Sequence, residues 1–495
     1  MSHEVLRRDD LEQMFSHRRI SRGTFVSALA ALGISAAGIE SIAGSLAISQ
    51  AQVPTPKYLV VMVMDAFRPD YTSLAPMPAL TRLAQSGISF NRAWVGQLES
   101  ETPPGHVTIS TGSRPQDDGL IGFEWRDPAT QQEILDGWPK GVIAGDMERD
   151  VRASGANSIP LAVKADDPAA KVVALSSEKV YAADGMGGWA ADYILFHQRS
   201  GPGNKTLTPA GVQGHLPPAS FIARPELHLQ LPARKFTDWD YLSGMLALAS
   251  LEDFQPKVLM VNFPGADVYG HPYGGPATPA VLSKVAAGID RNIDRIVQAY
   301  RKAGIYDQTL FVLTADHGMV PNDRAVDGAT TKATVRQSSG NYFFHTGGTM
   351  AAIYLHNRFH ARAVSAGMSK VPGVAGSYFQ HTVNGKYIYE SAPGLRIDTN
   401  LDAAYRYLLS TIQGPTAPDV IAPFRENTIG TVDTHAHGDH GGLNWGAQHI
   451  PLIISGPGVQ AGVSSDAPAR LMDIAPTILR LLNLPVHDMD GIVLA

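Results

Sequence analysis

Four short runs of mostly apolar residues recur along the chain, and three of them end abruptly in polar clusters. The runs are residues 58–64, 258–263, 310–313 and 450–454. Apolar runs of this length are typical of strands that are buried on both faces, as in a parallel sheet. The pattern therefore predicts a central sheet whose strands run mostly in one direction.

Segments with helical periodicity lie between these runs. From Val281 to Tyr300 the apolar residues recur every three to four positions, which predicts an amphipathic helix. Residues 472–482 are predicted to form a final helix, with Asp473 as its N-cap and Pro485 beyond its end. Strands that alternate with helices form an open α/β sheet, and such sheets bind ligands at the carboxyl ends of their strands.

Two long stretches, residues 126–239 and 321–423, lack this regularity. The first is rich in Gly, Pro and polar residues, and the second is mixed, with a strand-like run at residues 350–355. Both stretches are too long to be plain loops. We expect them to be insertions that fold over the active-site end of one catalytic domain, residues 52–495.

The first 51 residues have the composition of an export signal. Arg18 and Arg19 precede an uncharged stretch, residues 23–39, that is rich in Ala, Gly and Ser. This arrangement resembles a twin-arginine signal, and residues 49–51 would suit a signal peptidase. Glu40 interrupts the apolar stretch, which therefore makes a poor membrane-spanning helix. We expect a periplasmic or secreted protein, held at a membrane only if the signal stays uncleaved.

Composition narrows the possible chemistry. The chain has 495 residues, of which 44% are hydrophobic and 17% charged, as in globular proteins. Its formal net charge of −6 argues against general nucleic-acid binding, which requires a basic surface. Because the Cys count is 0, disulfides, thiol nucleophiles and Cys-ligated metals are excluded. Asp, Glu and the 17 His remain as metal ligands.

The polar residues next to the apolar runs are of the types that bind metals. Asp65 follows the first run, Asp267 and His271 follow the second, and Asp316 and His317 follow the third. A loop before the fourth run holds His435, His437, Asp439 and His440. Asp and His suit zinc when Cys is absent, and this set is large enough for two metal ions. Each motif alone has a structural explanation, but their joint position at one sheet edge favours a metal centre.

Taken in order, these segments resemble the type I phosphodiesterase/nucleotide pyrophosphatase branch of the alkaline phosphatase superfamily. The resemblance covers roughly residues 56–490, in separated blocks. It includes Thr-Pro-Pro-Gly-His-Val-Thr-Ile-Ser-Thr-Gly at residues 102–112, which is similar to the family's nucleophile segment and has Thr102 at the nucleophile's position. The resemblance implies an alkaline-phosphatase-like α/β/α sandwich with a mostly parallel central sheet and cap-like insertions.

The same resemblance implies two zinc ions and a ligand set for each. One zinc would be held by Asp267, His271 and His440, and the other by Asp65, Asp316, His317 and the oxygen of Thr102. His437 competes with His440 for its role, and the spacing to the strand that follows favours His440. His435 and His449 are expected to be structural or to lie behind the ligands.

The chain departs from the family pattern around the nucleophile. Phe123 stands where the family usually has an Asn that binds a phosphate oxygen, and Pro103 where it often has an aromatic residue. Both differences weaken a nucleotide-specific interpretation. Phe123 or Trp125 could offer a stacking face to substrate, and Lys179 or Arg126 could contact phosphate. Core packing and solvated surface charge remain the alternatives for these four residues.

The chemistry indicates hydrolysis of a phosphoric ester. A threonine hydroxyl is a weak nucleophile and no base is evident beside Thr102, so zinc would activate it to form a phospho-threonine. We predict a two-zinc phosphodiesterase or nucleotide pyrophosphatase acting on a small phosphoester. An alkaline phosphomonoesterase or phosphonate hydrolase is the alternative within this chemistry, and a catalytically inactive metal-dependent binding protein is the alternative of another class. Thr102 and the absence of Cys disfavour the sulfatase branch, which uses an oxidised Cys or Ser.

Overall fold

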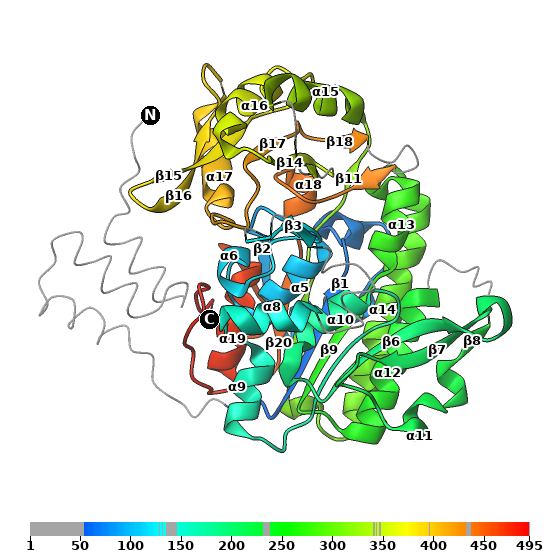
Figure 1. Ribbon diagram of the computed structural model, residues 1–495. Helices are drawn as coiled ribbons and strands as arrows, with labels where there is room; N and C mark the ends of the chain where they lie inside the picture. The colour runs from blue at the N-terminus through cyan, green and yellow to red at the C-terminus, as the bar shows by residue number, and fades with distance from the viewer. Residues whose placement is uncertain are drawn as a thin grey trace, which may run out of the picture.

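The computed structural model describes residues 54–494 except 128, 131, 135–145, 231–237, 340–341, 343, 346–347, 396 and 432–436. The expected export signal and His435 therefore lie outside the described residues. A ten-stranded sheet forms the centre, in the order β21-β2-β20-β10-β1-β9-β5-β6-β7-β8 (Figure 1). Its strands are β1 (Tyr58–Met64), β2 (Gly87–Trp94), β5 (Val172–Ser176), β6 (Tyr193–Ser200), β7 (Thr206–Gly211), β8 (Leu229–Gln230), β9 (Val258–Phe263), β10 (Thr309–Thr314), β20 (Leu452–Ser455) and β21 (Val463–Arg470).

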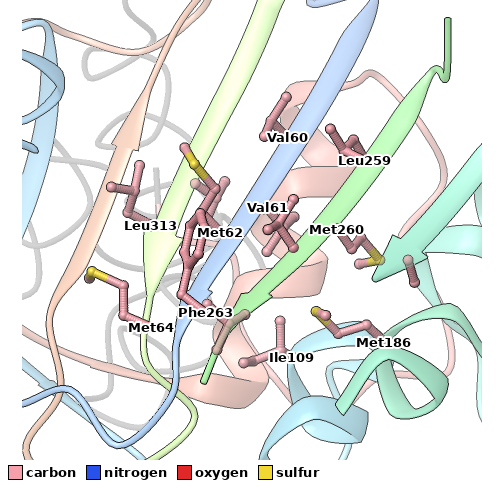
Figure 2. Packing of buried hydrophobic residues seen from close by; sticks show 14 of the residues in the cluster. Val60, Val61, Met62, Met64, Ile109, Met186, Leu259, Met260, Phe263 and Leu313 are labelled. Atoms are coloured by element: carbon pink, nitrogen blue, oxygen red, sulfur yellow. The ribbon is translucent and has the colours of Figure 1, made fainter. Parts of the chain in front are cut away.

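The four predicted strands correspond to β1, β9, β10 and β20. β1 lies between β9 and β10 and is parallel to both, whereas β20 runs antiparallel to β10. Every residue of β9 and β10 is buried, because helices cover both faces of the sheet. Figure 2 shows this packing: Met260 and Phe263 lie close to Ile109 and Met186, which come from helices on one face.

The helices form two layers, one on each face of the sheet. The first layer contains α5 (Thr102–Thr111), α8 (Asp146–Ser154), α9 (Ile159–Asp166), α10 (Val180–Gly187) and α19 (Ile474–Leu481). The second contains α4 (Pro78–Gln85), α12 (Asp238–Phe254), α13 (Gly265–Tyr273) and α14 (Pro279–Lys302). Shorter helices are α6 (Pro115–Asp118), α11 (Ala219–Ile222) and α18 (Trp445–Gln448). Within the described part of the chain, every helix is too short or too polar to cross a membrane.

Both predicted helices are present. The periodic apolar residues between Val281 and Tyr300 are buried on α14. The final helix is α19, and Asp473 occupies its N-cap position. The Asp473 carboxylate does not cap α19, however, because it accepts the backbone N–H groups of Arg470 and Ile492 instead.

A second sheet with its own apolar core forms a cap (top of Figure 1). Its order is β13-β14-β17-β15-β16. The strands are β13 (Phe344–His345), β14 (Met350–Tyr354), β15 (Tyr378–Val383), β16 (Lys386–Ser391) and β17 (Val420–Pro423), and the helices are α15 (Gly328–Ser339), α16 (Ala361–Met368) and α17 (Thr399–Leu409). Two-stranded pairs join β3 (Trp125–Arg126) to β4 (Glu133–Ile134), β11 (Val320–Pro321) to β19 (Gly438–Asp439), and β12 (Arg324–Asp327) to β18 (Thr428–Thr431).

The first predicted insertion, residues 126–239, is only partly separate from the core. We expected it to fold over the active-site end, but it contributes β5, β6, β7 and β8 to the central sheet. The apolar run of β5 is short, Val-Val-Ala-Leu, and charged residues flank it closely, so the sequence pattern did not distinguish it. β5 pairs in parallel with β9 and therefore ends at the same sheet edge as β9.

Candidate active site

Four adjacent parallel strands deliver polar residues to one edge of the central sheet. In spatial order they are β10, β1, β9 and β5. Just past their carboxyl ends lie Asp316 with His317, then Asp65, then Asp267, then Lys179. Parallel strands end at a common edge, which is where open α/β sheets bind ligands.

Thr102 is the first residue of α5 and is fully buried. The local sequence favours this helix, because prolines suit its first turn and Gly112 ends it with a φ of 66°. Pro103 and Pro104 have no N–H, so among the first three helical residues only Thr102 carries a backbone donor. Its Oγ1 lies 3.1 Å from Nε2 of His317.

The first set of expected ligands comes together around Asp267. His271 lies one helical turn after Asp267 on α13, and its Nε2 is 3.4 Å from Asp267 Oδ1. His440 comes from the loop after β19, and its Nε2 is 3.2 Å from the same oxygen. The nearest ligand atoms of these three residues all lie within 4.8 Å of one another.

The second set of expected ligands gathers around His317. Its Nε2 is 3.3 Å from Asp316 Oδ2 and 3.7 Å from Asp65 Oδ1, and all three side chains are buried. The other oxygen of Asp316 accepts the backbone N–H groups of Ala66 and His317. Those two bonds fix the carboxylate so that Oδ2 faces the site.

The hydrogen bonds of the three histidines fit cation binding. Each Nδ1 lies beside a backbone carbonyl: His317 beside Gly318 at 2.9 Å, His271 beside Gly438 at 3.0 Å, and His440 beside Ser100 at 3.2 Å. Because a carbonyl oxygen can only accept, each Nδ1 carries a hydrogen, which leaves Nε2 as the ring atom that can bind a metal ion. Each Nε2 faces a carboxylate oxygen, an arrangement that is stabilised by a positive charge between them, carried by a proton or by a metal ion.

The carboxylates support the same conclusion. Asp267 Oδ1 and Asp316 Oδ2 are buried, and histidine ring nitrogens approach each of them at 3.2 to 3.4 Å without a well-formed hydrogen bond among the described residues. A buried acceptor without a donor is costly unless a cation satisfies it. Asp, His and Thr oxygens and nitrogens are suitable zinc ligands, so the residues at both positions fit the expected metal ions.

Lys179 lies between the two sets of ligands. Its Nζ is 3.2 Å from Thr102 Oγ1 and 3.3 Å from Asp65 Oδ1, and it forms an ion pair with Asp267. Burial alone would lower the pKa of this ammonium, but Asp267 and Asp65 hold it well above its usual range. Lys179 is 4% exposed and stays positively charged, so it is not a solvated surface residue.

The remaining predicted contacts occupy different places. Phe123 is half-buried and its ring meets the edge of Tyr181, 5.3 Å between centroids. Trp125 is 3% exposed and belongs to the main apolar core, so it presents no stacking face to a substrate. Arg126 is buried and pairs with Asp419, away from the nucleophile.

His437 and His449 lie outside the ligand sets. The side chain of His437 is exposed, and its backbone N–H donates to the carbonyl of His271. His449 stacks on Trp445, with 4.6 Å between ring centroids, and its Nε2 lies 3.2 Å from the carbonyl of Asn91. Of the candidates for the last ligand, the structure brings His440 to Asp267.

Sequence reasoning missed three buried polar residues behind the ligands, namely His106, Ser176 and Asn262. His106 Nδ1 is 2.8 Å from the Thr102 carbonyl, and Asn262 Nδ2 donates to Asp65 Oδ2 at 2.9 Å. A polar residue inside an apolar strand, as Asn262 is in β9, was the signal that could have identified it. His106 stood inside the nucleophile segment without an assigned role.

Comparison with known proteins identifies the family. Residues 59–442 match the family described as type I phosphodiesterase/nucleotide pyrophosphatase. The chain belongs to this family. The resemblance seen in the sequence is thereby confirmed, and the superfamily is that of alkaline phosphatase.

The curated relatives include alkaline phosphatases and a protein described as a pyrophosphatase/phosphodiesterase. Alkaline phosphatase PhoK of Sphingomonas sp is 26% identical over 58% of this chain and 62% of its own length. The alignments span 45% to 62% of the lengths of the first three curated relatives.

Solved structures confirm the alkaline-phosphatase-like fold. That of alkaline phosphatase PafA has a TM-score of 0.67 at 17% identity, covering 89% of this chain and 98% of PafA. Murine ectonucleotide pyrophosphatase/phosphodiesterase 5, solved also as an inactive threonine-to-alanine variant with AMP, has TM-scores of 0.59 and 0.58 at 16% identity. The match covers 88% of this chain and 97% of the murine chain.

Proposed function

We propose that this protein is a metal-dependent phosphoric monoester hydrolase that acts through a phospho-threonine on Thr102. The observation that carries this proposal is the buried ammonium of Lys179, 3.2 Å from Thr102 Oγ1. At pH 7 a phosphomonoester carries about 1.5 to 2 negative charges, whereas a diester carries only one. An additional positive charge beside the nucleophile therefore matches the monoester better, although the sequence alone favoured a diester.

Two zinc ions are proposed to occupy the ligand sets, with Asp267, His271 and His440 at one and Asp65, Asp316, His317 and Thr102 at the other. When bound, zinc supplies positive charge that lowers the pKa of a hydroxyl or water and neutralises phosphoryl oxygens. The converging Nε2 atoms and the two buried carboxylate oxygens that they face support this assignment.

Thr102, Lys179 and the start of α5 have different roles in the proposed reaction. Thr102 Oγ1 attacks phosphorus, the bond to the ester oxygen breaks, and the alcohol leaves with a proton. Water then attacks the phospho-threonine, which releases phosphate and restores the hydroxyl. Thr102 sits at a helix N-terminus, where the helix dipole favours negative charge. Because Pro103 and Pro104 donate no hydrogen bonds, Lys179 supplies charge that backbone amides would otherwise provide.

A phosphodiesterase or nucleotide pyrophosphatase is the second candidate. The aromatic pair Phe123–Tyr181 favours it, because Phe123 is half-buried and Tyr181 follows Lys179 by two residues. Aromatic faces stack on bases and could bind the second substituent of a diester or dinucleotide. The murine relative whose inactive variant was solved in complex with AMP is named for this functional class.

Substrate kinetics separate the two candidates. We would measure kcat/KM of the zinc-loaded protein on p-nitrophenyl phosphate and on bis-p-nitrophenyl phosphate, for the unmodified chain and for Lys179→Met. We expect the monoester to be preferred, and the substitution to lower its kcat/KM roughly 100-fold while lowering that of the diester less than about 10-fold. Lys171→Met is the matched control, because Lys171 precedes the opposite end of β5.

If the diester is the preferred substrate, and Lys179→Met leaves the ratio of the two kcat/KM values unchanged, the second candidate function replaces the first. Zinc binding without turnover of either ester would instead indicate a metal-dependent binding protein.

A further inference from the structure

We propose that Asn262 is a positioning residue that decides which oxygen of Asp65 faces the metal centre. The inference rests on the proposed function, since it concerns the ligand set of Asp65, Asp316 and His317. It is carried by a buried hydrogen-bond network behind those ligands.

Asn262 is placed by its strand. It is the fifth residue of β9, whose neighbours are β1 and β5, and its register partners are Val63 and Ser176. The side chain is fully buried in a strand that is otherwise apolar. A buried primary amide needs partners for one oxygen and two hydrogens, and leaving them unmet is costly.

All of these needs are met, and by groups that fix the amide's orientation. The hydroxyl of Ser176 donates to Asn262 Oδ1 at 2.8 Å, and its own oxygen accepts the Lys179 backbone N–H at 3.1 Å. The amide nitrogen must then point the other way. It donates to Asp65 Oδ2 at 2.9 Å and to His106 Nε2 at 3.0 Å.

His106 locks the second amide hydrogen. Its Nδ1 lies 2.8 Å from the Thr102 carbonyl, so Nδ1 carries the hydrogen and Nε2 is the acceptor. The ring nitrogens are therefore both engaged, although His106 lies close to Asp65 and Asp316. This explains why His106 is a neighbour of the centre rather than one of its expected ligands.

These hydrogen bonds set the orientation of the Asp65 carboxylate. With Oδ2 held by Asn262, Oδ1 is the oxygen that faces the site, 3.3 Å from Lys179 Nζ and 3.7 Å from His317 Nε2. Without the amide, the carboxylate could rotate and present neither oxygen at the required angle. Partners of this kind typically change metal affinity 10- to 100-fold when removed.

Zinc affinity of the full-length protein tests the inference. Chelator competition would measure both zinc dissociation constants for the unmodified chain, Asn262→Ala and Ser176→Ala. We expect Asn262→Ala to weaken one site about 10- to 100-fold and to leave the other within about threefold. Ser176→Ala should weaken the same site by less. In that variant the Asn262 amide still has both N–H donors for Asp65 and His106, and it loses only the hydroxyl that fixes its orientation.

Asn292→Ala is the matched control, because Asn292 is also a buried asparagine and donates to the Gly288 carbonyl within α14. It should lower the melting temperature and leave both zinc constants unchanged. Equal weakening of both sites in Asn262→Ala, or unchanged affinity at both, would overturn the positioning role. A protein that binds no zinc at all would overturn the proposed function itself, and it would show this in the unmodified chain.

Discussion

At the scale of single residues, Lys179 helps to set the charge state of the site. Asp65, Asp267 and Asp316 are buried together, which by itself would favour their neutral forms. Lys179 and His271 nevertheless hold the pKa of Asp267 well below its usual range against the effect of burial. Burial and the nearby Asp316 raise the pKa of Asp65 to about 7. Against the effect of burial, His317 and His106 lower the pKa of Asp316 to about 2, so Asp267 and Asp316 are both ionised. The ammonium favours the ionised form of Asp267 in particular.

Thr102 gives the most direct prediction at this scale. We expect Thr102→Ala to lower kcat at least about 1000-fold, because it removes the hydroxyl that forms the phosphoenzyme, and Thr102→Ser to retain activity. Zinc content should stay at that of the unmodified chain, since six side-chain ligands remain. Acid trapping with labelled substrate should detect phosphoprotein only when a hydroxyl is present at this position. An alanine variant that keeps a tenth of the activity or more would contradict the assignment.

At the scale of elements, strand order explains both what the sequence predicts and what it leaves out. Apolar runs that end in Asp or His identified β1, β9 and β10 and the ligands that follow them. The sequence pattern did not identify β5, because its apolar run is short. Lys179, which follows β5, was therefore not placed beside Asp65. Asn262 and Ser176 meet only through the register of β5 with β9, which residue patterns along one strand do not contain. The contacts between strands depend on tertiary pairing, so they required the structure.

The start of α13 gives a prediction for one element. The Gly265 N–H donates to Asp240 Oδ1 at 2.8 Å, and a Cβ added at Gly265 would overlap the Asp240 carboxylate. Gly265→Ala should push α13 away from α12, move Asp267 and His271, and cost about 1 to 3 kcal/mol of stability. Thermal denaturation and zinc content would measure both effects.

Gly414→Ala provides the control for this substitution, because an added Cβ there meets no atom within 4 Å. The account of α13 is wrong if Gly265→Ala melts at the same temperature and holds the same zinc as this control.

At the scale of the whole molecule, one buried ion pair joins the core to the cap. Arg126 of β3 donates to the Leu355 carbonyl at 2.6 Å and pairs with Asp419, which also pairs with Arg358. Arg126 and Asp419 are each 1% exposed. The segment that carries Phe123 is therefore fastened to the cap by residues far away in the sequence. This is why Arg126, which looked like a phosphate contact in the sequence, has a structural partner instead.

The dependence of folding stability on pH is also a property of the whole molecule, and His197 on β6 contributes to it. Its Nε2 donates to the Leu227 carbonyl at 2.8 Å, and its buried Nδ1 has no hydrogen-bond partner among the described residues. Burial lowers the pKa of His197 from 6.5 to about 4. Between these values the unfolded chain binds a proton that the folded chain does not, so stability falls as pH drops. The full effect is roughly 3 kcal/mol.

His197→Gln should keep a donor for the Leu227 carbonyl and remove the titration. Urea denaturation from pH 8 to pH 4.5 should therefore show a smaller loss of unfolding free energy for the variant than for the unmodified chain, with the difference appearing below about pH 6.5. His487→Gln, at an exposed position near the C-terminus, controls for removal of an imidazole. If both variants follow the unmodified chain at every pH, His197 is not a group through which acid destabilises the fold.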